Sequence, residues 1–204
     1  MPSYNKPDFW SLKAQKEGYP ARSVYKLQET AEKFGLFRSI PEGFRVLDLG
    51  AAPGSWSLYT LRRLESRVFL VAADLSRLSR QYDKGLFDKN NFSFLQGDIT
   101  AAETKERIRS YSPFHLVMSD AAPGTTGNNG VDVLRSLALA EAALDYGESF
   151  LAPGGNLVVK VFQSGDSAAL LKRIREVFAS GKSFKPQACR RESFETYYLG
   201  LGKK

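Results

Sequence analysis

Apolar residues follow two different patterns along this chain. In some stretches of five to seven residues they are nearly continuous, which is typical of strands that are covered on both faces of a sheet. This pattern predicts strands at Phe44–Leu49, Arg67–Ala73, Asn91–Leu95, Phe114–Ser119, Asn156–Phe162, residues 182–187 and Thr196–Leu201. We expect the last of these strands to pair with an antiparallel neighbour.

In other stretches apolar residues recur every three or four positions, as on one face of a helix. The predicted helices are Phe9–Glu17 with Asp8 as its cap, Arg22–Phe34 ended by Gly35, a helix after Gly54 that runs to about Leu64, residues 103–110, Asp132–Leu151 and Ala168–Phe178. Alternating strands and helices imply an α/β fold, in which helices cover both faces of a mainly parallel sheet. We expect one domain over residues 1–204, with a basic helical lead-in at 1–40 and the core at 41–204.

The composition is that of a globular protein, with 43% hydrophobic and 25% charged residues. No apolar run reaches the length of a membrane span, and the first ten residues lack the apolar segment of a secretory signal. With one cysteine and one histidine, an internal disulfide is impossible and a structural metal site is not expected. We therefore expect a cytoplasmic protein without a membrane or metal partner.

The net charge of +7 is concentrated near the two ends of the chain. Residues 1–40 carry +3 and residues 172–204 carry +6, whereas residues 39–171 carry −2. This distribution favours a polyanionic partner, most simply a nucleic acid, over charge that only solubilises exposed helices. The candidate phosphate contacts are Lys6, Lys13, Lys16, Arg22, Arg190 and Arg191, and Tyr4, Phe9 and Trp10 either stack on bases or pack the first helix onto the body.

A turn of small residues follows the first strand, in the segment FRVLDLGAAPGSW (Phe44–Trp56). Gly50 and Gly54 permit backbone conformations that a side chain would hinder, and the free N–H groups at the helix start favour a negative group there. A nucleotide-like cofactor fits such a turn. The dinucleotide pattern G-x-G-x-x-G is absent, and the wider turn with Pro53 favours S-adenosylmethionine (SAM). An ordinary strand–helix turn is the alternative.

Charged residues follow the later strands, at the edge where open α/β sheets bind ligands. Asp74, about 20 residues beyond the turn, is placed to accept hydrogen bonds from both ribose hydroxyls of a nucleoside, and Asp98 is placed beside its adenine. Asp120 and Lys160 have apolar strand neighbours, so each would be costly to bury alone and we expect them to pair. The loop Ala121–Gly130 is rich in Gly, Asn and Thr, a composition that fits a mobile lid.

A set of longer motifs occurs in order between about Phe9 and Gly202. They are ARSVYKL (Ala21–Leu27), VLDLGAAPGSW (Val46–Trp56), FLQGDI (Phe94–Ile99), VMSDAAP (Val117–Pro123), VD before a long helix (from Val131), LAPGGNLVVKVFQ (Leu151–Gln163) and a terminal R-x-x-S-x-E-x-Y (Arg190–Tyr197). Together they resemble the FtsJ/RrmJ (RlmE) family of ribosomal RNA 2′-O-ribose methyltransferases. The resemblance implies a Rossmann-like SAM-dependent methyltransferase fold, with a mostly parallel seven-stranded sheet that has one antiparallel strand.

The resemblance also implies roles for individual residues. Its catalytic set falls on Lys26, Asp120, Lys160 and Glu195, and Glu195 fits the register of the last motif better than the neighbouring Glu192. The implied cofactor-binding positions are Gly50, Ala51, Pro53, Gly54, Trp56, Asp74, Leu75, Asp98, Ile99 and Asp120, with no metal. Lys160 would deprotonate or orient a ribose 2′-hydroxyl that attacks the methyl group of SAM, while Lys26 and Glu195 would hold the ribose.

The substrate that the resemblance implies is a uridine of 23S (large-subunit) ribosomal RNA in an assembled particle, methylated by a monomeric enzyme. Ser55 replaces a second glycine of the family turn, which a small side chain allows. The loop Gly124–Gly130 also departs from the family pattern, and this affects the choice of RNA more than the reaction. Transfer RNA or an mRNA cap remains an alternative substrate, and a protein that binds SAM and RNA without turnover is an alternative function.

Overall fold

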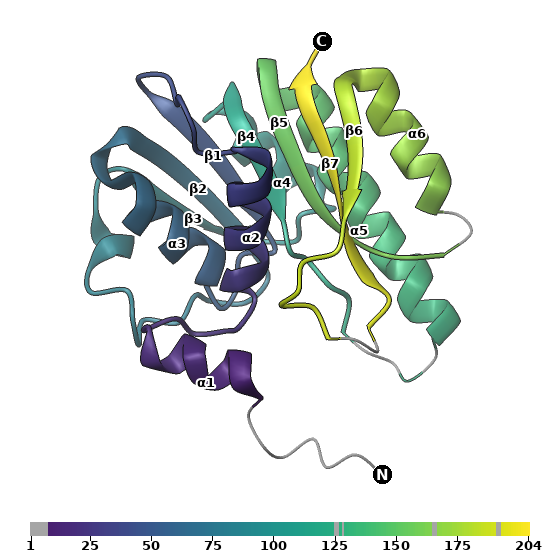
Figure 1. Ribbon diagram of the computed structural model, residues 1–204. Helices are drawn as coiled ribbons and strands as arrows, with labels where there is room; N and C mark the ends of the chain where they lie inside the picture. Colours follow the sequence, from purple (N-terminus) through teal and green to yellow (C-terminus); the bar gives the residue numbers. More distant parts are fainter. Residues whose placement is uncertain (1–7, 125–126, 128, 165–166, 191–192) are drawn as a thin grey trace.

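The computed structural model describes residues 8–204, apart from 125–126, 128, 165–166 and 191–192 (Figure 1). The strands are β1 (Phe44–Leu49), β2 (Val68–Asp74), β3 (Phe92–Gln96), β4 (Phe114–Ser119), β5 (Leu151–Phe162), β6 (Phe178–Phe184) and β7 (Glu195–Lys203). The α-helices are α1 (Phe9–Lys16), α2 (Val24–Phe34), α3 (Ser55–Leu64), α4 (Ala102–Arg109), α5 (Asn129–Phe150) and α6 (Ser167–Val177).

The strands form one seven-stranded sheet in the order β3-β2-β1-β4-β5-β7-β6. Neighbouring strands from β3 to β5 run parallel, and β7 runs antiparallel to both β5 and β6. This confirms the predicted mostly parallel sheet with one antiparallel strand. The chain builds outward from β1 to β3 and then returns to place β4 on the other side of β1. The strand order therefore reverses between β1 and β4, where open α/β sheets bind their ligands.

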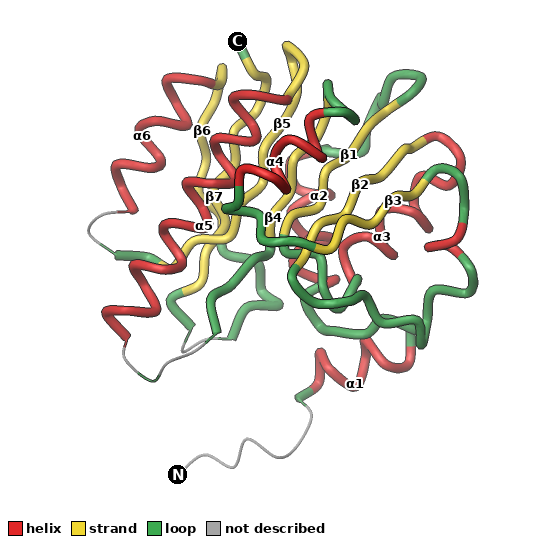
Figure 2. The backbone as a smooth tube through the Cα atoms, turned by 180° about the vertical axis from the view of Figure 1, so that it is seen from behind, coloured by secondary structure: helices red, strands yellow, loops and turns green. Residues whose placement is uncertain are grey.

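Helices cover both faces of the sheet, as Figures 1 and 2 show from opposite sides. On one face, Leu27 of α2 and Leu61 of α3 belong to one buried apolar cluster with the sheet. On the other face, Ile108 of α4, Ala143 of α5 and Leu170 of α6 belong to a second. Burying one large aliphatic side chain contributes roughly 1.5–3 kcal/mol, so the two layers hold the strand ends in fixed positions.

α1 lies beyond the carboxyl ends of the parallel strands, near the start of α2 (Figure 1). The Asp8 carboxylate accepts a hydrogen bond from the Ser11 N–H, which confirms Asp8 as the predicted cap. The rings of Trp10 and Tyr25 lie 5.1 Å apart. This contact supports the interpretation that Trp10 packs the first helix onto the body, whereas the Phe9 side chain is exposed.

The predicted start of the fifth strand is wrong. β5 begins at Leu151 rather than Asn156, because the Pro-Gly-Gly sequence continues the strand instead of turning it. Two steps along β4, from Phe114 to Leu116, correspond to five steps along β5, so the extra residues bulge out of the ladder. A Cβ atom on Gly155 would lie 2.9 Å from a backbone oxygen, so the bulge requires glycine there.

Other boundaries differ from the prediction as well, most of them by one or two residues. β6 spans Phe178–Phe184 rather than residues 182–187, since the chain turns directly from α6 into the strand. α5 begins at Asn129 rather than Asp132, so the predicted lid loop is shorter than expected. Residues 125–126 and 128 of that loop lie outside the described residues, and a lid there stays a prediction.

Candidate active site

The turn after β1 lies against the loop after β4. Gly50 has a φ of 69°, and its N–H donates to the carbonyl of Ala73 at 2.9 Å. A Cβ atom on Gly50 would lie 2.5 Å from the Cβ of Ala121. Glycine is therefore what lets the two loops meet at the reversal of strand order.

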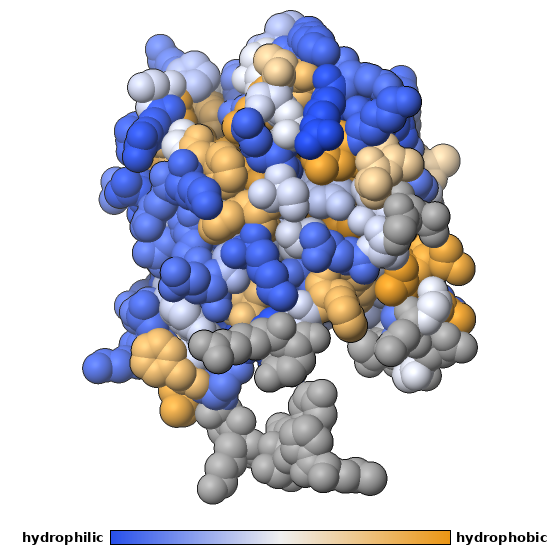
Figure 3. Space-filling model, turned by 45° about the vertical axis from the view of Figure 1, so that its right-hand side comes forward, coloured by the Kyte–Doolittle hydropathy of each residue, from blue (hydrophilic) through white to orange (hydrophobic). Residues whose placement is uncertain are grey.

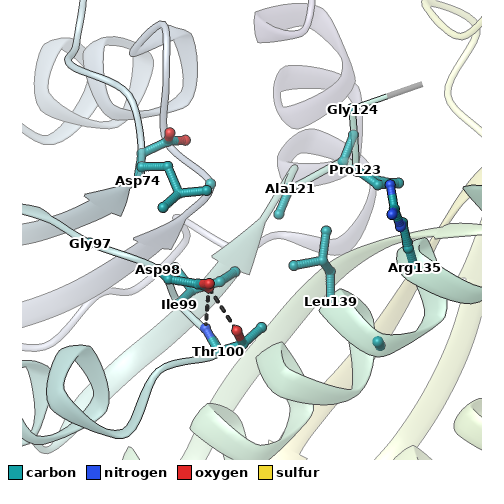
Figure 4. Close-up of a pocket in the computed structure, with 14 residues that line it drawn as sticks. Asp74, Gly97, Asp98, Ile99, Thr100, Ala121, Pro123, Gly124, Arg135 and Leu139 are labelled. Atoms are coloured by element: carbon teal, nitrogen blue, oxygen red, sulfur yellow. Dashed lines mark hydrogen bonds between the residues drawn. The ribbon is translucent and has the colours of Figure 1, made fainter. Parts of the chain in front are cut away.

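A pocket of about 610 Å³ opens beside this contact, at the carboxyl ends of the parallel strands (Figure 4). Its volume is in the range of small-molecule sites. The lining residues come from four strand ends and the start of α5: Gly50, Asp74, Leu75, Gly97, Asp98, Ile99, Thr100, Ala121, Ala122, Pro123, Gly124, Arg135, Ala138 and Leu139. In Figure 4, Arg135 lies across the pocket from Asp74 and Asp98. Two carboxylates, apolar side chains and one guanidinium fit the hydroxyls, adenine and carboxylate of SAM.

The two carboxylates expected to bind the nucleoside are ordered by backbone donors. Asp74 accepts hydrogen bonds from the N–H groups of Ala52 at 2.9 Å and Ser76 at 2.7 Å. Asp98 accepts from the N–H and the hydroxyl of Thr100, and these bonds lower the pKa of Asp98 below its ordinary value. A carboxylate has about four acceptor positions, so both residues retain acceptors for a ligand.

The predicted cofactor positions divide into two groups. Those that line the pocket are Gly50, Asp74, Leu75, Asp98 and Ile99, and those outside the lining are Ala51, Pro53, Gly54, Trp56 and Asp120. Trp56 is buried, and its indole N–H donates to the carbonyl of Ser23 at 2.8 Å. This bond joins the start of α3 to the residue before α2. Direct contact of either group with the cofactor stays a prediction.

Lys26 on α2 and Glu195 at the start of β7 form an ion pair. Their Nζ and Oε1 atoms are 2.5 Å apart, and both side chains are largely buried. Burial alone would lower the pKa of Lys26, but the charges of Asp120 and Glu195 raise it above its ordinary value. Lys26 is thus a fixed cation at this end of the sheet.

Asp120 and Lys160 form the ion pair that the sequence predicts. Nζ of Lys160 lies 3.1 Å from Oδ1 of Asp120 and also donates to the Asp120 backbone carbonyl. The Lys160 side chain is only 6% exposed. Burial would raise the pKa of Asp120, but Lys160 and Lys26, with a hydrogen bond from Tyr197, hold it below its usual range. Asp120 is therefore ionised throughout the neutral pH range.

Tyr197 connects the two ion pairs. Its hydroxyl oxygen lies 2.6 Å from Oδ1 of Asp120 and 3.3 Å from Oε1 of Glu195. Burial and these two carboxylates raise the pKa of Tyr197 well above its ordinary value, so the phenol stays a donor. In the sequence, Tyr197 stands out only as part of a motif. Its place two residues after Glu195 in a strand puts both on one face, and this signal could have revealed its position in the site.

Cys189 is a second residue near the site that no sequence pattern singles out. Its thiol donates to Oε1 of Glu195 at 3.2 Å. Burial and the charge of Glu195 raise the pKa of Cys189 to about 12. Cys189 is therefore a neutral thiol that helps to fix the Glu195 carboxylate.

Hydrogen bonds hold the α2 segment to both halves of the site. The Ser55 hydroxyl accepts from the N–H of Ala21 at 2.9 Å and lies 3.1 Å from its carbonyl. Glu29 accepts from the N–H groups of Gln187 and Ala188, at 2.7 and 2.9 Å. The helix that carries Lys26 is thus tied to the cofactor turn and to the segment that leads into β7.

The candidate phosphate contacts are partly engaged within the protein. Lys13 lies over the rings of Trp10 and Tyr25, at 5.4 and 4.5 Å from their centroids. Arg22 pairs with Asp8, and Nε of Arg190 lies 4.0 Å from the same carboxylate. Tyr4, Lys6, Arg191 and the competing Glu192 lie outside the described residues.

Within the described part of the chain, no three His, Cys, Asp or Glu side chains gather into a group that could hold a metal ion. No helix in the same part is long and apolar enough to cross a bilayer.

Solved structures share this fold. A structure from Plasmodium falciparum described as a ribosomal RNA methyltransferase matches with a TM-score of 0.72 and 22% identity, over 91% of this chain and 98% of that chain. Human methyltransferase-like protein 13 in complex with SAH (S-adenosylhomocysteine) matches with a TM-score of 0.62 and 11% identity, over 87% of this chain and 82% of that one. These likenesses show a Rossmann-like fold, with the pocket at the carboxyl ends of its parallel strands.

Sequence comparison then gives the family. The chain belongs to the FtsJ-like methyltransferases, whose family pattern it matches over residues 19–203. It is 46% identical over 201 residues to ribosomal RNA large subunit methyltransferase E of Treponema denticola, covering 98% of this chain and 97% of that protein. It is 44% identical over 197 residues to the protein of the same name from Borrelia garinii subsp. bavariensis, covering 97% of each chain.

Proposed function

We propose that this protein transfers the methyl group of SAM to a ribose 2′-hydroxyl of large-subunit ribosomal RNA, at a uridine of the 23S RNA. The names of its relatives support this class of substrate. The observation that carries the reaction is the buried pairing of Lys26 with Glu195 and of Lys160 with Asp120, next to the cofactor pocket. Burying such ion pairs costs desolvation free energy, and they are typical of functional sites.

The contacts of Lys160 support its assignment as the residue that handles the hydroxyl proton. Its Nζ gives one hydrogen bond to the Asp120 carboxylate and one to the Asp120 backbone carbonyl. A neutral amine has two N–H donors and one lone pair, so these contacts leave the lone pair to accept the proton of the 2′-hydroxyl. An ammonium group has three donors, which leaves one N–H to hold the hydroxyl oxygen. In either protonation state Lys160 positions the attacking oxygen.

Bound SAM supplies an electrophilic methyl group. The 2′-oxygen forms a bond to that carbon as the carbon–sulfur bond breaks, the bonding electron pair passes to sulfur, and the hydroxyl proton passes to Lys160 or to water. Lys26 and Glu195 hold the ribose, while Asp120 steers Lys160 toward it. Alignment of two bound reactants supplies much of the acceleration, since effective molarities reach about 10⁵–10⁸ M.

We further propose that the enzyme acts as a cytoplasmic monomer and that its basic ends bind RNA phosphates. The charges of +3 over residues 1–40 and +6 over residues 172–204 support this surface. Affinity for RNA is then expected to fall steeply as the salt concentration rises.

The test is methyl transfer from isotopically labelled SAM to separate pools of large ribosomal particles, naked ribosomal RNA, transfer RNA and capped mRNA. We expect label at a 2′-O-methyluridine of the large-subunit RNA. Label confined to transfer RNA or to caps would overturn the substrate class. Absence of label from every pool, with SAM still bound, would favour a protein that binds without turnover.

A further inference from the structure

The large exposed apolar side chains gather at one end of the molecule. In the part of the chain that the structure describes, they are Phe9, Leu12, Leu75, Val131, Leu134 and Phe194. They lie on α1, after the end of β2, at the start of α5 and just before β7, all near the carboxyl ends of the parallel strands (Figures 1 and 2). In Figure 3, apolar surface appears near the lower edge in separate places among hydrophilic residues, not as one continuous patch. Separate apolar side chains among charged ones suit single bases better than a protein partner.

Phe194 is the aromatic member of this set that adjoins the ion-paired residues. It directly precedes Glu195, which pairs with Lys26. Phe194 lies immediately before the first residue of β7, and its side chain is exposed whereas that of Glu195 is largely buried. A ribose held at Lys26 and Glu195 would leave the ring free to meet the next nucleotide of the RNA.

The backbone on both sides of Phe194 is fixed, although its side chain is 71% exposed. The Phe194 carbonyl accepts from the N–H of Gln163 at 2.9 Å, just past the end of β5. Before it, the carbonyl of Ser193 accepts from Nζ of Lys185 at 2.6 Å. An exposed ring on an ordered backbone is preorganised, so stacking would cost little additional entropy.

The segment before this ring carries cations that complement an RNA backbone. Lys185 and Arg190 are exposed on the segment that leads to Phe194, and Arg190 lies near Asp8 together with Arg22. Proteins that bind single strands commonly combine such phosphate contacts with an aromatic ring for each base.

We propose that Phe194 stacks on an unpaired base of the RNA substrate, that of the nucleotide next to the methylated ribose. This inference rests on the proposed RNA methylation and adds a positioning residue to it. Stacking needs only the π-face of the base, so the contact sets the register of the RNA without selecting one base.

The test measures binding of a fluorescein-labelled single-stranded RNA by wild type and by Phe194→Ala, Phe194→Leu and Phe194→Trp, over a series of salt concentrations. We expect the Ala and Leu variants to bind roughly 5- to 100-fold more weakly and the Trp variant to bind like wild type. The slope of log affinity against log salt stays unchanged, since no phosphate contact is lost. In Lys185→Ala, that slope instead falls by about one. Leu134→Ala is the matched apolar control from the same end of the molecule.

Methyl transfer to ribosomal particles separates the two proposals. We expect Phe194→Ala to raise KM for RNA and to leave kcat within a few-fold, since the ring touches no reacting atom. Stacking is overturned if wild type does not bind the single strand, if Phe194→Ala binds it like wild type, or if Phe194→Leu retains full affinity. A defect in Phe194→Ala seen only with ribosomal particles would identify a protein contact instead. Wild type that binds RNA but methylates none would overturn the proposed function and leave the stacking contact standing.

Discussion

The hydroxyl group of Tyr197 lies 2.6 Å from the Asp120 carboxylate and within 3.3 Å of the Glu195 carboxylate. One phenol therefore joins the acidic members of the two ion pairs. Its bond to Asp120 helps to hold the pKa of that carboxyl below its usual range. Asp120 must stay ionised to pair with Lys160, so Tyr197 is expected to widen the pH range in which the site is assembled.

Tyr197→Phe tests this relationship. The variant keeps the buried ring and loses the hydrogen bond, so the pKa of Asp120 rises and the acidic limb of the pH–rate profile moves to higher pH. We expect kcat to fall roughly 10- to 150-fold, as for a lost bond of about 1.5–3 kcal/mol to a charged group. Tyr198→Phe is the matched control, because the Tyr198 hydroxyl bonds Ser167 on the other face of the sheet. An acidic limb unchanged in Tyr197→Phe would contradict the proposed coupling.

Much of the site follows from local sequence features. The strand Phe44–Leu49 could be predicted from its own apolar residues, and the turn after it from its glycines. Asp74, Asp98 and Asp120 each follow an apolar run, and parallel strands bring such ends to one edge. The pairing of Lys160 with Asp120 followed from the cost of burying either alone.

Other features depend on contacts that no local pattern reveals. The bulge in β5 lies where its pairing with β4 changes register, and this depends on the position of β4. Taken by itself, the Pro-Gly-Gly sequence is typical of a turn. Tyr197 has the composition of a core residue, and its part in the site depends on where Asp120 lies across the sheet. The same is true of Cys189, whose bond to Glu195 requires the fold of the segment before β7.

Lys160→Met tests the other ion pair. The change removes the amine and leaves the buried Asp120 carboxylate without it, so we expect a loss of roughly 10²- to 10⁴-fold in kcat and of about 3–5 kcal/mol in stability. Adding Asp120→Asn is expected to restore much of the stability and none of the activity, because an amide needs no counter-charge. Thermal unfolding and methyl transfer are measured on both, with Lys182→Met on the exposed face of β6 as control. A folded Lys160→Met enzyme with near wild-type turnover would remove Lys160 from the mechanism.

Asp74→Asn tests the cofactor pocket. The amide oxygen can still accept a backbone bond from Ala52 or Ser76, but the charge that faces the pocket is lost. We expect the Kd for SAM to rise roughly 10- to 100-fold and the affinity for RNA to stay unchanged. Separate titrations of each ligand measure this. Asp88→Asn, at an exposed carboxylate paired with Arg80, is the control. An equal loss of affinity for SAM and for RNA would show that the variant disturbs the fold.

Gly50→Ala tests the contact between the two loops, and Gly43→Ala is its matched control. Both glycines have a φ of 69°, so an L-residue at either is strained by about 1–2 kcal/mol. A Cβ atom at Gly43 meets nothing within 4 Å, whereas one at Gly50 lies 2.5 Å from Ala121. We expect Gly43→Ala to lower Tm slightly and to keep SAM binding. Gly50→Ala is expected to lower Tm further and to weaken SAM binding, and equal effects of the two substitutions would argue against the close approach.

Asp48 on β1 gives the protein a pH-dependent stability. Its Oδ2 accepts from the Ser57 hydroxyl at 2.6 Å, and Oδ1 has no hydrogen-bond partner among the described residues. Burial raises the pKa of Asp48 from an ordinary 3.8 to about 7, and the charges of Asp120 and Asp74 act in the same direction. The folded state therefore binds this proton more tightly than the unfolded state. The resulting stabilisation is complete below about pH 4 and is lost as the pH rises through about 7.

Asp48→Asn removes this titration and keeps the shape of the side chain. We expect the free energy of unfolding of wild type to fall between about pH 5 and pH 8 by roughly 2–3 kcal/mol from this group. The variant is expected to lack that part of the fall and to be the more stable protein at about pH 8. Urea unfolding at both pH values measures the difference, with Asp88→Asn as the exposed control. Parallel pH dependence in wild type and Asp48→Asn would show that Asp48 is ionised throughout, because only a group that titrates in this range can make the two curves diverge.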